Sequence, residues 1–255
     1  MKKYQIDFKI EANTPLSPSL HLLDLNPVDS ALPELLPGQF VNILPPKSSG
    51  KLLRRPISVC DVKESRLRLM IKRAGAGTDA ICDLCEGDSL NIVLPLGNGF
   101  TVPEDKNTRI LLVGGGVGIA PLLYYGRCLA DNGIVPRFLL GGRSESDIPM
   151  LTEFSDLGDV FITTEDGSAG TKGFVTDHSI ISDCYDLICC CGPSPMMKAV
   201  GKVATASGTK CEVSLENMMA CGIGACLCCV QETVEHHNEC VCTKGPVFDF
   251  MKIKW

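Results

Sequence analysis

Residues 109–121 read RILLVGGGVGIAP, an apolar run that leads directly into a glycine cluster. The run does not alternate with polar residues, which is typical of a parallel strand buried on both faces. Ala120 and Pro121 then predict the start of a helix, because proline is tolerated in a first helical turn. A strand that passes through glycines into a helix forms a phosphate cradle, in which backbone amides and the helix dipole face a pyrophosphate. The predicted cradle residues are Gly114, Gly116, Gly118 and Pro121.

Further apolar runs follow at residues 136–140, 160–163 and 186–190, with helical stretches between them. This alternation predicts a doubly wound α/β domain over residues 104–207 that binds NAD. Ligands bind where the carboxyl ends of such strands meet, so we expect the segment after the last run to join the cradle. That segment is Cys191, Gly192 and Pro193. The glycine motif alone matches only G-x-G-x-x-P, and a tight structural turn would explain it nearly as well.

Residues 1–103 consist of short apolar runs separated by proline, glycine and asparagine. Residues 66–72 alternate polar and apolar side chains, as a strand with one buried face should. Repeated strands without long helical patterns predict a small antiparallel β-barrel. Within it, residues 54–58 read RRPIS, which suits a flavin site with arginine for phosphate and serine for the isoalloxazine, or else a basic turn before a strand. Residues 74–78 would offer backbone amides to a second phosphate at the start of a short helix.

Cysteine is unusually frequent, with fifteen residues in 255. An odd total and an N-terminus without an apolar signal core predict a reducing cytoplasm rather than a disulfide framework. We interpret Cys189–Cys191 and the pair Cys82 and Cys85 as small buried hydrophobes. Residues 208–255 are rich in cysteine and too short for a core of their own without a metal or a neighbouring domain. They hold Cys211, Cys221, Cys226, Cys228, Cys229, Cys240 and Cys242.

Cys221, Cys226 and Cys229 have the spacing C-x4-C-x2-C, and Cys242 follows at a distance. This is the plant-type ligand spacing of a [2Fe–2S] cluster. Gly222 and Gly224 supply the backbone freedom that a loop wrapped around two irons requires. Structural zinc is the alternative, but it prefers two separated cysteine pairs, and a second well-spaced pair is missing.

The choice among neighbouring cysteines stays open at two places. Cys228 adjoins Cys229, and Cys240 lies two residues before Cys242. We favour Cys242 as the fourth ligand because residues 243–246 read TKGP, a turn that would hold it in a loop. Cys240 would then belong to a strand.

The composition excludes other classes of protein. A formal charge of −6 argues against non-specific binding to nucleic acid, which needs a cationic surface. The longest uncharged stretch, residues 110–126, is broken by glycines and a proline, so we expect no membrane span. The order of motifs is informative as well. A nicotinamide transfers two electrons as hydride and an iron–sulfur cluster transfers one, so a flavin belongs between them.

These motifs together resemble those of the electron transfer subunits of type B, NAD-dependent dihydroorotate dehydrogenases, within the ferredoxin–NADP reductase superfamily. The resemblance covers essentially the whole chain, and its two most specific segments lie in the cysteine-rich part. The segments that carry it are residues 54–58, 114–121, 164–168, 191–193, 214–216, 220–226 and 241–248.

The resemblance implies one FAD, one [2Fe–2S] cluster and a separate catalytic subunit with FMN, assembled as a heterotetramer with two copies of each chain. Dihydroorotate would be oxidised on that subunit in pyrimidine synthesis, and electrons would pass through the cluster and FAD to NAD. No residue of this chain would be catalytic. Cys221, Cys226, Cys229 and Cys242 would hold the cluster. FAD would contact Arg55, Pro56, Ile57, Ser58, Ile71, Lys72, Arg73, Gly77 and Thr78.

One position departs from the family pattern, which usually has glycine where this chain has Cys228. Its thiol would either sit idle or compete for an iron. Two alternative functions also remain. One is an FAD and [2Fe–2S] subunit of another NAD(P)H-linked reductase, such as a ferredoxin-, hydrogenase- or sulfide-reducing complex. The other is an iron–sulfur sensor with a degenerate nucleotide domain.

Overall fold

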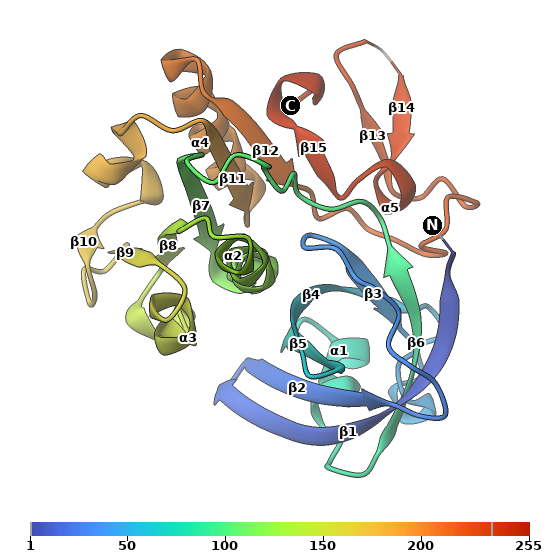
Figure 1. Cartoon of the computed structure of the whole chain (residues 1–255). Coiled ribbons are helices and arrows are strands. Elements are labelled where there is room, and N and C mark those ends of the chain that lie inside the picture. Colours follow the sequence, from blue (N-terminus) through green and yellow to red (C-terminus); the bar gives the residue numbers. More distant parts are fainter. Residues whose placement is uncertain (1, 236) are drawn as a thin grey trace.

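A computed structural model of the chain describes residues 2–235 and 237–255. Its N-terminal part is a closed antiparallel barrel of six strands in the order β1-β2-β5-β4-β3-β6 (Figure 1), which confirms the predicted barrel. Apolar side chains of alternate residues fill the interior; in β5 these are Leu67, Leu69 and Ile71. Helix α1 (Ala76–Cys82) adds Ile81 and Cys82 to the same core. The strands are β1 (Tyr4–Ser17), β2 (Leu20–Pro27), β3 (Phe40–Ile43), β4 (Arg55–Lys63), β5 (Arg66–Lys72) and β6 (Ser89–Leu96).

The middle of the chain forms a seven-stranded sheet in the order β10-β9-β8-β7-β11-β12-β15. Its neighbouring strands are parallel except for β12 and β15. The predicted α/β domain is therefore confirmed. The strand order reverses at β7, which has β8 on one side and β11 on the other, and this reversal opens a crevice at the carboxyl ends of the strands. The strands are β7 (Ile110–Gly115), β8 (Arg137–Gly142), β9 (Asp159–Thr164), β10 (Thr171–Lys172), β11 (Leu187–Cys191), β12 (Lys210–Ser214) and β15 (Val247–Asp249).

Helices cover both faces of this sheet (Figure 1). Ile110 and Leu112 of β7 pack with α2 (Ala120–Asp131) and α3 (Leu151–Ser155) on one face. Leu111 and Val113 pack with α4 (Ser194–Ser207) on the other. Two buried faces explain why the strand sequence lacks alternation. The run Cys189–Cys191 is fully buried in β11, as expected for small hydrophobes. The same expectation is confirmed for Cys82 but wrong for Cys85, which is exposed in the turn after α1.

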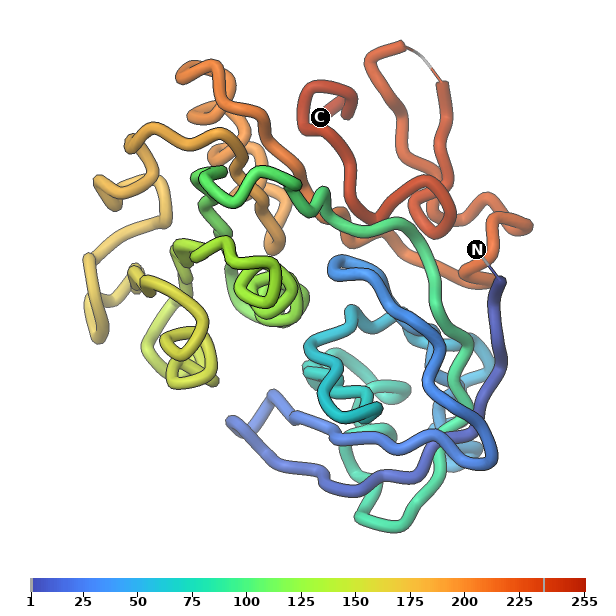
Figure 2. Tube along the Cα trace, viewed as in Figure 1, coloured from blue at the N-terminus to red at the C-terminus, as the bar shows by residue number. Residues whose placement is uncertain are grey.

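The cysteine-rich segment leaves the sheet after β12 and returns to it as β15, which pairs with β12 (Figure 2). It contains the hairpin β13 (Val230–Glu232) and β14 (Asn238–Cys240), followed by α5 (Val241–Lys244). Its side chains Cys229, Val241 and Cys242 share a core with Phe40 and Leu96 of the barrel. The segment thus fills the space between the barrel and one face of the sheet. The division at residues 103 and 207 stays a prediction.

Cys242 does not lie in a loop, as the TKGP turn had suggested, but in the single turn of α5. The Gly245 amide donates to the Val241 carbonyl at 3.1 Å and closes this turn, and Pro246 prevents its continuation. Cys240 ends strand β14, as expected.

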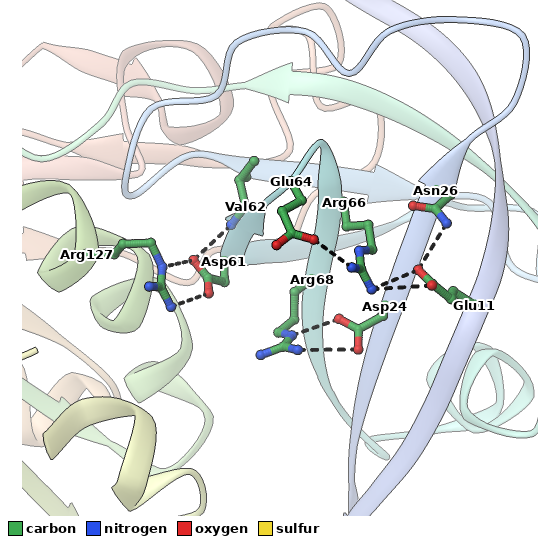
Figure 3. A network of polar contacts seen from close by, with 9 residues as sticks. All are labelled: Glu11, Asp24, Asn26, Asp61, Val62, Glu64, Arg66, Arg68 and Arg127. Carbon is green, nitrogen blue, oxygen red and sulfur yellow. Dashed lines mark hydrogen bonds and ion pairs between the residues drawn. The ribbon is translucent and has the colours of Figure 1, made fainter. Parts of the chain in front are cut away.

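A buried ion pair joins the barrel to the sheet (Figure 3). Arg127 of α2 donates from Nε and Nη2 to the two carboxylate oxygens of Asp61 in β4, both at 2.8 Å. Asp61 is only 1% exposed. Figure 3 also shows the pairs on the barrel surface, among them Arg66 with Glu64 and Glu11. Among residues 2–235 and 237–255, no helix is long and apolar enough to cross a bilayer.

Candidate functional site

A cavity of about 470 Å³ lies at the carboxyl ends of the parallel strands, where the strand order reverses. Gly116 and Pro193, both predicted from the sequence, line it. Gly114, Gly118, Pro121, Cys191 and Gly192 are buried. The walls include Lys72, Gly141, Arg143, Asp147, Thr163, Glu165, Phe174 and Met196.

The two predicted halves of the cradle meet in space. A Cβ atom on Gly118 would stand 2.5 Å from the carbonyl oxygen of Cys191, so the turn after β7 touches the end of β11 backbone to backbone. Gly115 packs against the Met196 side chain, with a Cβ at 2.6 Å from its sulfur. A side chain at Gly118 would collide with the backbone of Cys191, so this position needs glycine, and the contact brings residues 73 positions apart to one crevice.

Arg143 and Asp147 pair with each other at the cavity wall. Asp147 accepts from the Arg143 backbone amide at 3.1 Å and from its Nε at 3.3 Å. The Asp147 side chain is 29% exposed and that of Arg143 is 79% exposed. The carboxylate therefore lies at the wall and holds the guanidinium beside it.

Sequence reasoning missed two residues of this wall. Phe174 is a largely exposed aromatic that follows β10. Thr163 is the last residue but one of β9, and its buried hydroxyl has no hydrogen-bond partner among the described residues. Its position at a strand's carboxyl end is the signal that could have identified it.

The predicted flavin residues of β4 are half-buried, with Ile57 packed against the barrel core and Arg55 next to the start of α1. The Arg55 guanidinium covers Gly77, where a Cβ would stand 2.5 Å from its Nε. Thr78 accepts from the Ala74 amide at 2.9 Å and shapes the turn before the helix. The structure thus brings Arg55, Gly77 and Thr78 to one place. Pro56, Ile57 and Ser58 continue from Arg55 along the strand.

The Arg54 guanidinium does not lie beside that of Arg55 but interacts with the barrel backbone. It donates from Nη1 to the carbonyls of Asn42 and Asn91 at 3.1 and 3.0 Å, and burial lowers its pKa. Arg54 therefore ties β3 to β6 within the barrel.

The three predicted residues at the end of β5 point in different directions. The Ile71 side chain is fully buried in the barrel core. Arg73 donates to Asp83 at 2.7 Å and to His21 at 3.3 Å. Of these three residues only Lys72 lines the nucleotide cavity, and it therefore connects β5 of the barrel to that cavity.

The four predicted cluster cysteines lie around one loop that receives backbone amides. The amides of Ile223 and Cys226 donate to Cys221 Sγ, both at 3.4 Å. Gly224 donates to Cys242 Sγ at 3.1 Å. The Cys242 amide donates to Cys229 Sγ at 3.4 Å. Amides directed at sulfur are the environment that an iron–sulfur cluster needs.

The thiols also interact in two pairs. Burial by itself would raise the pKa of the Cys221 thiol. Hydrogen bonds from Ile223, Cys226 and Ala225 lower it by more, so that the pKa is about 6. Burial and the Cys229 thiol raise the pKa of Cys242 to about 12. Cys221 thus contacts Cys226, and Cys242 contacts Cys229. Among the described residues, no three metal-binding side chains converge on a single ion, whereas paired thiols suit two irons.

The two rival cysteines differ in placement. Cys228 is exposed on the loop. Cys240 is half-buried, and burial followed by the nearby Cys229 thiol raises its pKa. Cys240 therefore places a fifth sulfur next to the four predicted cluster ligands.

Two family models match the chain. The iron–sulfur cluster binding domain of dihydroorotate dehydrogenase B matches residues 216–254, and the oxidoreductase NAD-binding domain matches residues 112–202. The dihydroorotate dehydrogenase B (NAD(+)) electron transfer subunit of Listeria monocytogenes is 38% identical over 98% of this chain and 99% of its own length. Its counterpart in Caldanaerobacter subterraneus is 42% identical over 83% and 84%.

A solved structure of an NADH-dependent reduced ferredoxin-NADP oxidoreductase is also similar, with a TM-score of 0.86 and 30% identity over 97% of this chain and 90% of that one.

Proposed function

The chain belongs to the family of electron transfer subunits of dihydroorotate dehydrogenase B, and from this premise we propose that it carries electrons from the FMN of a separate dihydroorotate-oxidising subunit to NAD(+). It is an NAD-linked oxidoreductase subunit of pyrimidine biosynthesis whose cofactors are FAD, a [2Fe–2S] cluster and NAD. The observation that carries the proposal is the meeting of three sites. The cysteine segment packs against barrel strand β3, and Lys72 extends from the barrel to the nucleotide cavity.

We assign the cluster to Cys221, Cys226, Cys229 and Cys242. Hydrogen bonds from a backbone amide to a sulfur join Cys226 to Cys221 and Cys242 to Cys229, which supports placing these four thiols around one cluster. Amide donors already surround these sulfurs, so the residues fit the group.

We assign FAD to the surface formed by β4 and the start of α1. Arg55 would bind phosphate with its guanidinium, which lies over Gly77 where the helix amides begin. Ser58 lies on the same strand and offers a hydroxyl to the ring system. When bound, FAD supplies the exchange between hydride transfer and single-electron transfer.

The partner contact is proposed for the exposed apolar side chains around the cluster loop. Met218, Ile223 and Leu227 are 84%, 49% and 63% exposed. Electron transfer requires the cluster to lie near the partner's flavin, so a surface beside the cysteines is the appropriate one. We further propose a heterotetramer with two copies of each subunit, located in the cytoplasm, where fifteen free thiols remain reduced.

Leu227→Glu is expected to weaken binding to the catalytic subunit by about 100-fold, since an interface core does not accommodate an unpaired charge. Titration by surface plasmon resonance measures the effect. Val135→Glu is the matched control, because Val135 is 71% exposed on the nucleotide domain away from the cysteine segment. Equal affinities for the two variants would contradict the proposed contact.

Asp147→Asn is expected to shift coenzyme preference towards NADP by about tenfold in the ratio of the two kcat/KM values. The carboxylate would repel a 2′-phosphate and also holds Arg143, whereas asparagine keeps the hydrogen bond to the backbone without the charge. Diaphorase rates with NADH and NADPH measure the ratio. Asp156→Asn, an exposed acid of the same domain, is the control. An unchanged ratio in Asp147→Asn would rule out this role.

The overall proposal is tested with the chain purified under anaerobic conditions. Flavin and [2Fe–2S] absorbance should bleach on addition of NADH. Mixing with the FMN-containing subunit should then give dihydroorotate-dependent reduction of NAD(+). A colourless protein after reconstitution would defeat the proposal, and bleaching without dihydroorotate turnover would indicate another reductase.

A further inference from the structure

Asn42 is a fully buried amide without a partner. It lies on β3, is 1% exposed, and neither Nδ2 nor Oδ1 makes a hydrogen bond within residues 2–235 and 237–255. Its backbone is held firmly, since its carbonyl accepts from Arg54 at 3.1 Å. A buried amide without hydrogen-bond partners destabilises the folded state, so its presence indicates that a bound group supplies the missing partner.

The direction of the side chain follows from the alternation of β3. Val41 and Ile43 point into the barrel core, and Phe40 points outward into the core shared with the cysteine segment. Asn42 therefore points outward as well. There it meets the cluster loop, because a Cβ on Gly222 would stand 2.7 Å from Asn42 Nδ2.

Gly222 directly follows Cys221, so the orphaned amide lies where the thiols gather. On the neighbouring strand β4, Asn42 pairs with Pro56, which belongs to the proposed flavin site. Asn42 thus occupies the barrel wall between the two proposed redox sites. The sulfur of Cys221 already attracts two backbone amides of its own loop, and Asn42 brings a donor from a different part of the fold.

We propose that Asn42 donates a hydrogen bond from its side-chain amide to a sulfur atom of the cluster next to Cys221 and thereby raises the cluster's reduction potential. This rests on the proposed function, which assigns the cluster to Cys221. Hydrogen bonds to sulfur stabilise the more negative, reduced form, and they are among the factors that set the potential of such clusters. Asn42 is a positioning residue that tunes the electron acceptor.

The test is redox titration of the reconstituted protein, monitored by the EPR signal of the reduced cluster. Asn42→Leu keeps the approximate shape and removes the donor. We expect the ratio of reduced to oxidised cluster at a fixed potential to fall about tenfold, which corresponds to a midpoint about 59 mV lower for a one-electron couple. Asn42→Ala also removes the donor and should lower the midpoint in the same direction.

A second measurement separates tuning from a structural role. Thermal unfolding of the cluster-free protein should show that Asn42→Leu is at least as stable as the wild type, because the amide has no partner there to lose. Thr163→Val is the matched control. It removes a buried hydroxyl that likewise lacks a partner among the described residues, but at the nucleotide cavity, and should leave the reduction midpoint of the cluster unchanged.

Wild-type midpoints in both Asn42 variants would overturn the inference. Failure of both to take up a cluster while the cluster-free protein remains folded would support it, since the amide would then be required for assembly. A wild-type chain without any cluster would instead contradict the proposed function.

Discussion

Replacement of Cys242 by serine is expected to remove most of the iron and sulfide from the chain, whereas replacement of Cys240 should leave both in place. Cys242 Sγ is buried and receives the Gly224 amide at 3.1 Å, so its thiolate would be stabilised where the other sulfurs lie. Cys240 ends β14 and is more exposed. We expect at least about tenfold less iron per chain in Cys242→Ser, since even the loss of a group that merely supports a ligand costs 10–100-fold in metal affinity.

Iron and acid-labile sulfide per chain, measured after anaerobic reconstitution, provide the readout. Cys228→Gly is the matched control, because it changes an exposed thiol in the same loop and restores the residue that is usual in the family. It should retain the cluster fully. Equal iron loss in the Cys240 and Cys242 variants, or loss in the reverse order, would refute the assignment of the fourth ligand.

Arg127→Leu is expected to destabilise the protein by about 3–5 kcal/mol, because it leaves the buried Asp61 carboxylate without its partner. For a chain of this size such a loss lowers the unfolding midpoint by roughly 10 °C. Urea unfolding followed by circular dichroism measures the change, with wild type and variant in the same state of cofactor loading.

Two further variants define the cause of that loss. Arg66→Leu removes a guanidinium that is 41% exposed on the barrel surface and should cost less than about 1 kcal/mol. Asp61→Leu combined with Arg127→Leu should recover much of the stability, since apolar packing often replaces a buried pair without loss. If the double variant were as unstable as the single one, the cost would come from lost packing at α2 rather than from the orphaned carboxylate.

The features that could be predicted from the sequence were those encoded locally. The unalternated run of β7 reflects burial on both faces, and the alternation in residues 66–72 reflects a barrel wall with one buried face. The C-x4-C-x2-C spacing likewise belongs to a single loop, so three of the four assigned sulfurs are visible within nine residues.

The remaining features depend on contacts between distant segments. The pairing of β15 with β12 supplies hydrogen bonds to a three-residue strand that has no signal of its own. Arg54 and Arg55 are adjacent and chemically alike, yet one is captured by Asn91 and the other faces Gly77. Asn42 is a polar residue on a strand that is buried on both faces, which becomes apparent only when the cysteine segment covers the barrel.

The return of β15 to the sheet has a mechanical consequence. Because the cysteine segment is anchored by β12 at one end and β15 at the other, it is an inserted loop of the nucleotide sheet rather than an appendage on a hinge. Asn98 reinforces this anchorage by donating to the carbonyls of Lys244 and Val247, both at 2.9 Å. If FAD and the cluster lie where we propose, this anchorage fixes the gap between them, and we expect the rate of electron transfer across it not to depend on the viscosity of the medium.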